Sequence, residues 1–131
     1  HLCGPDNDQY AMVQRYVPEI EAGEKRVLLA CGEIVGQYRR IAGGNDHRTN
    51  VSQGAIAEPC DLTTEERDYC TRLAIELEDH GTYFAGIDLA YPWLIEINVV
   101  NPGGVVTIDQ LTGVDHAPRV AQLISSKLLN T

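Results

Sequence analysis

Apolar and polar residues alternate along several runs of the chain, which is the two-residue period of a β-strand. Residues 86–104 contain one pair of such runs on either side of Tyr91-Pro92-Trp93, and residues 25–31 and 34–41, rich in strand-forming residues, make a second pair. Each pair is joined by a short turn, so each is predicted to form a hairpin. A further short strand is expected over residues 12–17, where Pro18 ends it. The sheet is therefore predicted to be antiparallel.

Two stretches have the spacing of an amphipathic helix instead. In the first, Thr63-Thr64-Glu65-Glu66 forms a capping box, apolar residues then recur at helical spacing, and Gly81 stops the helix. In the second, Asp115 is the expected cap. Its apolar stripe consists of Ala117, Val120, Ala121, Ile124 and Leu128. Residues 105–112 are compatible with either a short helix or coil, and the polar residues 42–57 are predicted to form a long loop.

The length and composition indicate one globular domain. The chain has 131 residues, of which 44% are hydrophobic and 22% charged, enough for one core but few for two. We predict a single α+β domain over residues 1–131, with a loop at residues 1–11 and the helices packed on one face of an antiparallel sheet, opposite the face of Asp88 and Glu96. Because the sequence opens with His1 rather than Met, it is expected to be a segment of a longer protein.

The charge and the cysteines exclude several classes of partner. A net charge of -9 argues against binding to nucleic acid or to an anionic membrane, since both require a basic face. No apolar run reaches the length of a membrane span. The cysteines have no Cys-x-x-Cys spacing and no histidine at zinc-ligand distance, so reduced thiols and a cytoplasmic location are expected. They are Cys3, Cys31, Cys60 and Cys70.

Two carboxylates are predicted to face each other in the second hairpin. If the turn is centred on Pro92, Asp88 lies across from Glu96, and opposed like charges destabilise a sheet unless a cation or a proton lies between them. Leu94 and Asn98 are expected on the same face as Glu96. Two carboxylates and an amide oxygen are ligands that Mg²⁺ prefers. The alternative is that both acids lie on a solvated face in a different register. If they do repel, Asp88→Asn should stabilise the chain by roughly 0.2–1 kcal/mol.

Basic residues gather around the predicted loop of an otherwise acidic chain. Arg26, Arg39, Arg40 and Arg48 flank or lie within it. Ordinary surface charge is one explanation. Long polar loops beside a sheet are often functional, so an anion-binding site is the other.

The order of several motifs resembles the C-terminal part of bacterial glutathione synthetases, which are ATP-grasp ligases. The similarity covers residues 12–128. Its motifs are Val13-Gln14-Arg15-Tyr16-Val17-Pro18, Gly23-Glu24-Lys25-Arg26-Val27, Arg40-Ile41, Arg48-Thr49-Asn50, Gly86-Ile87-Asp88 and Glu96-Ile97-Asn98-Val99. The resemblance implies the C-terminal ATP-grasp subdomain of a homo-oligomeric parent enzyme. That family uses ATP with Mg²⁺, or Mn²⁺, to phosphorylate a carboxylate, which an amine then attacks to form a peptide bond.

The resemblance also implies a role for each matching residue. The metal ligands would be Asp88, Glu96 and Asn98, and the catalytic cations that neutralise phosphate and acyl-phosphate charge would be Arg26 and Arg40. The nucleotide would contact Gln14, Arg15, Tyr16 and Val17 beside the adenine and Glu24 at the ribose. The substrate would contact Arg48, Asn50, Asn101 and Gly103.

Three departures from the family leave the substrate open. Glu24 stands where the family has an aspartate, and Asn101-Pro102-Gly103-Gly104 replaces a Ser-Pro-Thr stretch and a following arginine. The family's N-terminal domain and first ATP-binding half are absent. The leading interpretation is a glutathione synthetase segment acting on γ-glutamylcysteine and glycine. The alternatives are another ATP-grasp amino-acid ligase, such as a glutamate ligase, and a nucleotide-binding module without catalysis.

Overall fold

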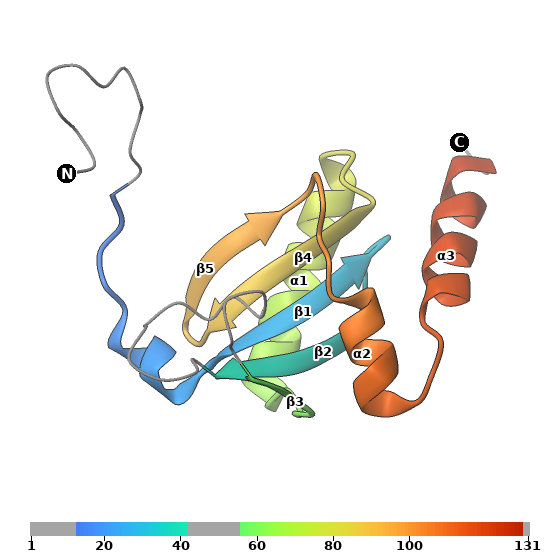
Figure 1. Ribbon diagram of the computed structural model, residues 1–131. Coiled ribbons are helices and arrows are strands. Elements are labelled where there is room, and N and C mark those ends of the chain that lie inside the picture. Colours follow the sequence, from blue (N-terminus) through green and yellow to red (C-terminus); the bar gives the residue numbers. More distant parts are fainter. Residues whose placement is uncertain (1–12, 42–55, 130–131) are drawn as a thin grey trace, which may run out of the picture.

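A five-stranded antiparallel sheet organises the protein. The computed structural model describes residues 13–41 and 56–129, so the predicted loop at 1–11 and most of the loop at 42–57 lie outside the described residues. The strands stand in the order β3-β2-β1-β4-β5 (Figure 1). Their bounds are β1 Glu24–Ala30, β2 Glu33–Ile41, β3 Ile56–Glu58, β4 Phe84–Ala90 and β5 Trp93–Asn98, and the helices are η1 Pro18–Ala22, α1 Thr64–Asp79, α2 Val105–Thr112 and α3 Ala117–Leu129.

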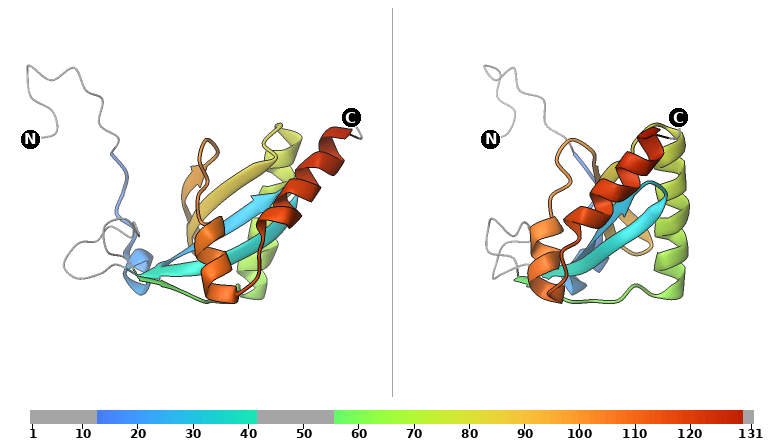
Figure 2. Two further views of the ribbon diagram at one scale, coloured as in Figure 1. Left: turned by 45° about the vertical axis from the view of Figure 1, so that its right-hand side comes forward. Right: turned by 90° about the vertical axis from the view of Figure 1, so that its right-hand side faces the viewer.

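Helices cover both faces of this sheet. The predicted α+β class and both hairpins are confirmed, but the expectation that the helices pack on one face is wrong (Figures 1 and 2). The right-hand view of Figure 2 shows the strands between α1 and α2. One core cluster joins Val27 and Ile87 to α1, and a second joins Leu28 to α2 and α3. The physical reason is the apolar run at residues 27–30 of β1, because a strand that is apolar on both sides must be covered on both sides.

The capping box at the start of α1 is confirmed in full. The Thr63 hydroxyl accepts a hydrogen bond from the Glu66 backbone N–H at 3.2 Å, and the Glu66 carboxylate accepts one from the Thr63 N–H at 2.8 Å. These bonds satisfy two N–H groups that the first helical turn cannot pair internally. At the other end, Gly81 has a φ of +81°, a left-handed conformation that favours glycine. The helix is therefore fixed at both ends by local sequence.

The β4–β5 hairpin has the predicted pairing at Asp88 but not along its whole length. Asp88 lies opposite Glu96, whereas Leu89 lies opposite Leu94, so one extra residue forms a bulge in β5. Leu94 packs with the α1 core cluster, not on the face of Glu96 as expected. A bulge shifts the alternation of side chains by one residue, and this shift is not visible in the spacing alone.

Two short segments differ from the predictions. Residues 13–17 form no strand, and the 3-10 helix η1 follows them with Pro18 in its first turn. Proline is favoured at the start of a helix because it lacks the N–H that such a position leaves unpaired. Residues 56–57, assigned to the long loop, instead open β3, which pairs with the outer side of β2.

The C-terminal part forms two helices on the Asp88 side of the sheet. Residues 105–112, left open by the sequence, are helical. Asp115 accepts a hydrogen bond from the Ala117 N–H at 3.1 Å, as its capping role requires. Of the predicted stripe, Val120 is buried and Ile124 packs on the core, whereas Leu128 is 59% exposed. None of the described helices has the length and apolar character needed to cross a membrane.

Candidate active site

Four charged side chains are buried together on the face of the sheet that α2 and α3 partly cover. They are Glu24 and Arg26 of β1, Arg40 of β2 and Asp88 of β4, and each is at most 8% exposed. The register explains why they meet, because Glu24 pairs with Arg40 and Arg26 pairs with Asp88 on adjacent strands. Directly paired residues point to the same side of a sheet, so four separate positions converge. We call them the charged cluster.

The Asp88 carboxylate is the centre of this cluster. Arg26 donates from Nε to Oδ1 at 2.5 Å and from Nη2 to Oδ2 at 2.9 Å, which is the bidentate geometry of arginine and carboxylate. Arg40 Nη2 lies 2.7 Å from Asp88 Oδ2 and also donates to Glu24. Burial works against the charged Arg26 guanidinium, but the hydrogen bonds and charge of Asp88 outweigh it and the pKa of Arg26 is raised. The two positive and two negative charges balance.

The Asp88 carboxylate has counter-charges that the pattern within the hairpin did not predict. Asp88 is 2% exposed and paired with two guanidinium groups, whereas Glu96 is exposed to solvent on the edge strand β5. Arginine side chains from β1 and β2 therefore supply positive charge to the Asp88 carboxylate. Sequence spacing within the hairpin could not reveal this, since both arginines lie far away along the chain.

The predicted metal ligands are close together, but they do not form a complete metal site. No cluster of three or more His, Cys, Asp or Glu side chains suited to a metal occurs within residues 13–41 and 56–129. The donor chemistry of Asp88, Glu96 and Asn98 nevertheless fits Mg²⁺. Asp88 Oδ1 accepts one hydrogen bond from Arg26 and keeps a lone pair. The buried Asn98 Nδ2 has no partner among the described residues. Exchange of the amide nitrogen and oxygen positions would place Oδ1 there instead, and the oxygen is the end of the amide that can bind Mg²⁺. The remaining positions would come from water or phosphate oxygens, as is usual for Mg²⁺.

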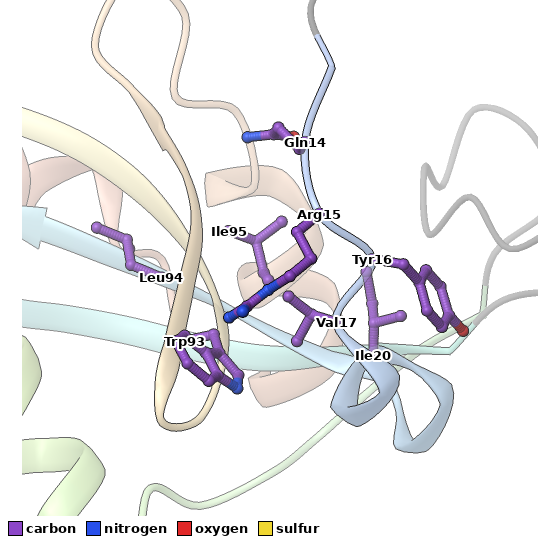
Figure 3. Close-up of a pocket in the computed structure, with 8 residues that line it drawn as sticks. All are labelled: Gln14, Arg15, Tyr16, Val17, Ile20, Trp93, Leu94 and Ile95. Carbon is purple, nitrogen blue, oxygen red and sulfur yellow. The ribbon is translucent and has the colours of Figure 1, made fainter.

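The residues predicted to lie beside the adenine line a pocket of about 390 Å³. Gln14, Arg15, Tyr16 and Val17 form one wall, and β5 contributes the opposite wall through Trp93 and its neighbours (Figure 3). The Arg15 guanidinium lies over the Trp93 ring, 5.2 Å from its centroid, which is a cation–π contact. The lining is mainly apolar with a few polar groups at its edge, as is typical of small-molecule sites. Trp93 was missed by the sequence reasoning, although a lone tryptophan beside a turn was a visible signal.

The other predicted residues are distributed differently. Glu24, expected at the ribose, is 2% exposed and its carboxylate accepts a hydrogen bond from Arg40. Asn101 and Gly103 are exposed in the segment that follows β5. Arg48 and Asn50 lie outside the described residues. Sequence reasoning also missed Pro102, whose carbonyl accepts a hydrogen bond from Arg26 Nη1.

The three cysteines in the described part of the chain have thiol pKa values above the ordinary value, so they are protonated at neutral pH. Burial raises the pKa of Cys31 and Cys60, and it raises that of Cys70 to about 11 with a further contribution from Glu66. Because thiolates are the reactive species, Cys70, which is fully buried, should not react with iodoacetamide in the folded chain. Mass spectrometry of the labelled peptides would detect this, with the denatured chain as the control. Labelling of Cys70 at the same rate with and without denaturant would contradict the expectation.

The fold of the chain resembles that of two solved ligases. It matches the ATP-grasp ligase PsnB complexed with a minimal precursor at a TM-score of 0.54 and 20% identity, over 79% of this chain and 34% of that one. It matches D-alanine–D-alanine ligase from Bacillus anthracis, complexed with ATP, at 0.52 and 13%, over 81% and 38%. At these identities the likeness concerns the fold, which is the ATP-grasp fold.

Sequence comparison identifies the family among proteins with the ATP-grasp fold. Residues 2–113 match the model of the prokaryotic glutathione synthetase ATP-grasp domain, and the chain belongs to this family. The glutathione synthetase of Nostoc sp. (strain PCC 7120) is 38% identical over 117 residues, which are 89% of this chain and 36% of the relative. That of Synechocystis sp. (strain PCC 6803) is 40% identical over 109 residues, 83% and 34%. The chain therefore spans about a third of the length of these relatives.

Proposed function

We propose that this chain is the C-terminal ATP-grasp segment of an ATP-dependent carboxylate–amine ligase, and that the parent reaction is the joining of γ-glutamylcysteine to glycine. The observation that carries the proposal is the charged cluster, in which two buried arginines converge on one aspartate. Fixed guanidinium groups in a water-poor site are what stabilises the charge of a transferred phosphoryl group. Membership of the glutathione synthetase family supports the choice of substrates.

The nucleotide would bind with its base in the pocket between residues 14–17 and β5. Backbone groups of Gln14 to Val17 would read the ring edge, and the Trp93 indole offers a flat apolar surface to the base. Glu24 is the proposed ribose residue. The Glu24 carboxylate already accepts a hydrogen bond from Arg40, so it would have to accept hydrogen bonds from Arg40 and from the ribose at the same time. The pocket accounts for the orientation of the base rather than for chemistry.

The phosphates would lie toward the charged cluster. Asp88, Glu96 and Asn98 would hold Mg²⁺, which when bound offsets phosphate charge and polarises the transferred group. Arg40 would donate hydrogen bonds to the phosphoryl oxygens as the substrate carboxylate becomes an acyl phosphate. Asn101 and Gly103, with Arg48 and Asn50, are the proposed substrate contacts. The amine then displaces phosphate from the acyl phosphate, which leaves an amide, ADP and phosphate.

The proposal is tested by assaying the full-length ligase that contains this segment. We expect ADP release and glutathione formation that require γ-glutamylcysteine, glycine and Mg²⁺ together. Glutamate, alanine and serine in place of glycine serve as matched acceptor controls. Turnover with one of those acceptors but not glycine would identify a different ligase. Nucleotide binding without ADP release under every condition would identify a non-catalytic module and contradict the proposal.

The 131-residue chain by itself should not turn over ATP. It spans about a third of the length of its relatives. The resemblance to ATP-grasp ligases implies a site that closes between two halves, of which this chain would be one. The measurement is a coupled assay of ADP formation with all substrates and Mg²⁺ present, with the full-length ligase as the positive control. Ligation by the purified chain at a rate comparable to that of the full-length enzyme would show that the site is complete within these residues.

A further inference from the structure

The segment between β5 and α2 contacts the charged cluster through Pro102. Residues 99–104, here called the strap, leave the end of β5 and return to the start of α2. Pro102 is buried in the middle of the strap, whereas Asn101 and Gly103 on either side of it are exposed. Pro102 is therefore the residue through which the strap is anchored to the rest of the fold.

Two close approaches leave the strap no room to move inward. A Cβ added at Gly86 of β4 would lie 2.9 Å from the Pro102 carbonyl oxygen and 3.3 Å from Pro102 Cβ. A Cβ added at Gly104, whose φ is +88°, would lie 3.2 Å from the Tyr38 hydroxyl. Contacts under 3.4 Å are tighter than ordinary packing allows. The backbone of the strap therefore rests directly on β4 and on the Tyr38 ring.

The two buried arginines are used in different ways. Arg26 engages all three of its nitrogens, with Nε and Nη2 on Asp88 and Nη1 on the Pro102 carbonyl. Arg40 contacts Glu24 and Asp88 through Nη2, and its buried Nε has no hydrogen-bond partner among the described residues. A buried donor without a partner costs free energy, which a ligand oxygen can recover. Arg26 is thus occupied by the protein, and Arg40 retains donor capacity for a ligand.

We propose that Arg26, to which the family resemblance gives a catalytic role, is instead a positioning residue that fastens the strap to Asp88. One planar side chain links the proposed metal ligand Asp88 to the backbone that carries Asn101 and Gly103. Because the guanidinium is rigid, the strap and the carboxylate are held at a fixed separation. The link itself is an observation of the fold, whereas the consequence for substrate binding rests on the proposed function.

The link is tested by ¹⁵N relaxation of the 131-residue chain with Arg26→Lys. Lysine keeps a charge beside Asp88 but presents one nitrogen where Arg26 uses three. We expect the order parameters of the Asn101, Gly103 and Gly104 amides to fall from about 0.85, typical of rigid backbone, to below about 0.6, with β4 unchanged. Arg40→Lys is the matched control, since Arg40 does not contact Pro102, and should leave the strap rigid. An unchanged strap in Arg26→Lys, or an equal loosening in Arg40→Lys, would overturn the proposal.

A second variant reaches the strap without removing the ion pair. Gly86→Ala adds a methyl group that displaces the Pro102 carbonyl, so it should loosen the same amides while the chain stays folded. This variant decides the question if Arg26→Lys does not fold. A rigid strap in Gly86→Ala would show that the anchor lies elsewhere and would count against the proposal.

The kinetic consequence is measured in the full-length ligase. Arg26→Lys should raise KM for γ-glutamylcysteine or glycine at least about tenfold and leave KM for ATP within about threefold, because it misplaces substrate contacts while the nucleotide pocket is intact. A fall in kcat with both KM values unchanged would show that Arg26 touches the reacting group instead. If the unmodified ligase does not use these substrates, the proposed function fails, whereas the relaxation experiment still decides the role of Arg26.

Discussion

Asp88→Asn is expected to lower the free energy of unfolding of this chain by about 3–5 kcal/mol, the usual cost of removing one partner from a buried ion pair. Asp88 is 2% exposed, and its carboxylate is the shared counter-charge of Arg26 and Arg40. With asparagine at this position, the two buried guanidinium groups would keep Glu24 as their one acidic counter-charge in the charged cluster. The sign is opposite to the one expected from sequence, where relief of repulsion from Glu96 predicts a gain.

The matched control is Glu96→Gln on the other strand of the same hairpin. Glu96 is exposed and pairs directly with Asp88, so its charge should matter little for folding, within about 0.5 kcal/mol. Chemical denaturation of the three chains measures both effects. If Asp88 and Glu96 hold Mg²⁺ in the full-length ligase, both variants should lose activity there, because a neutral amide is a poorer ligand than a carboxylate. Equal stability of Asp88→Asn and the unmodified chain would show that Asp88 is not the electrostatic centre of the cluster.

The second large effect is expected in catalysis. Arg40→Lys should lower kcat of the full-length ligase by about 10²-fold, with a smaller change in KM for ATP, because the charge that Arg40 is proposed to meet develops mainly in the transition state. Lysine is chosen over alanine because it leaves a positive charge between Glu24 and Asp88. The cluster should then stay neutral and folded, and circular dichroism would verify this.

Arg39 provides the control for that experiment. It is the next residue of β2, points to the opposite face and pairs with Glu58 of β3, and its side chain is 41% exposed. Arg39→Lys should therefore leave kcat within about twofold, as expected for a surface substitution. A loss confined to KM for ATP in Arg40→Lys would mean that Arg40 only binds the nucleotide. Similar losses for both variants would mean that general positive charge, not the position of Arg40, is what matters.

Local patterns in the sequence were sufficient for most of the elements. The hairpin of β1 and β2, the capping box of α1 and the opposition of Asp88 and Glu96 all depend on residues close together along the chain. Steric preferences and hydrogen bonds of neighbouring residues act there directly. The motifs that resemble glutathione synthetases are also local, and the family is confirmed by comparison.

Tertiary structure alone decided which charged side chains of the site contact one another. Whether Asp88 is repelled or neutralised depends on Arg26 and Arg40, which reach it because β1 pairs with β4, and this pairing joins segments that are far apart in the sequence. The bulge that turns Leu94 to the α1 side and the helices on both faces also depend on how elements pack together. The physical reason is that burial makes charge pairing and close packing strong, and burial is a property of the folded chain. The sequence thus determined which charges are present, and the fold determined which of them meet.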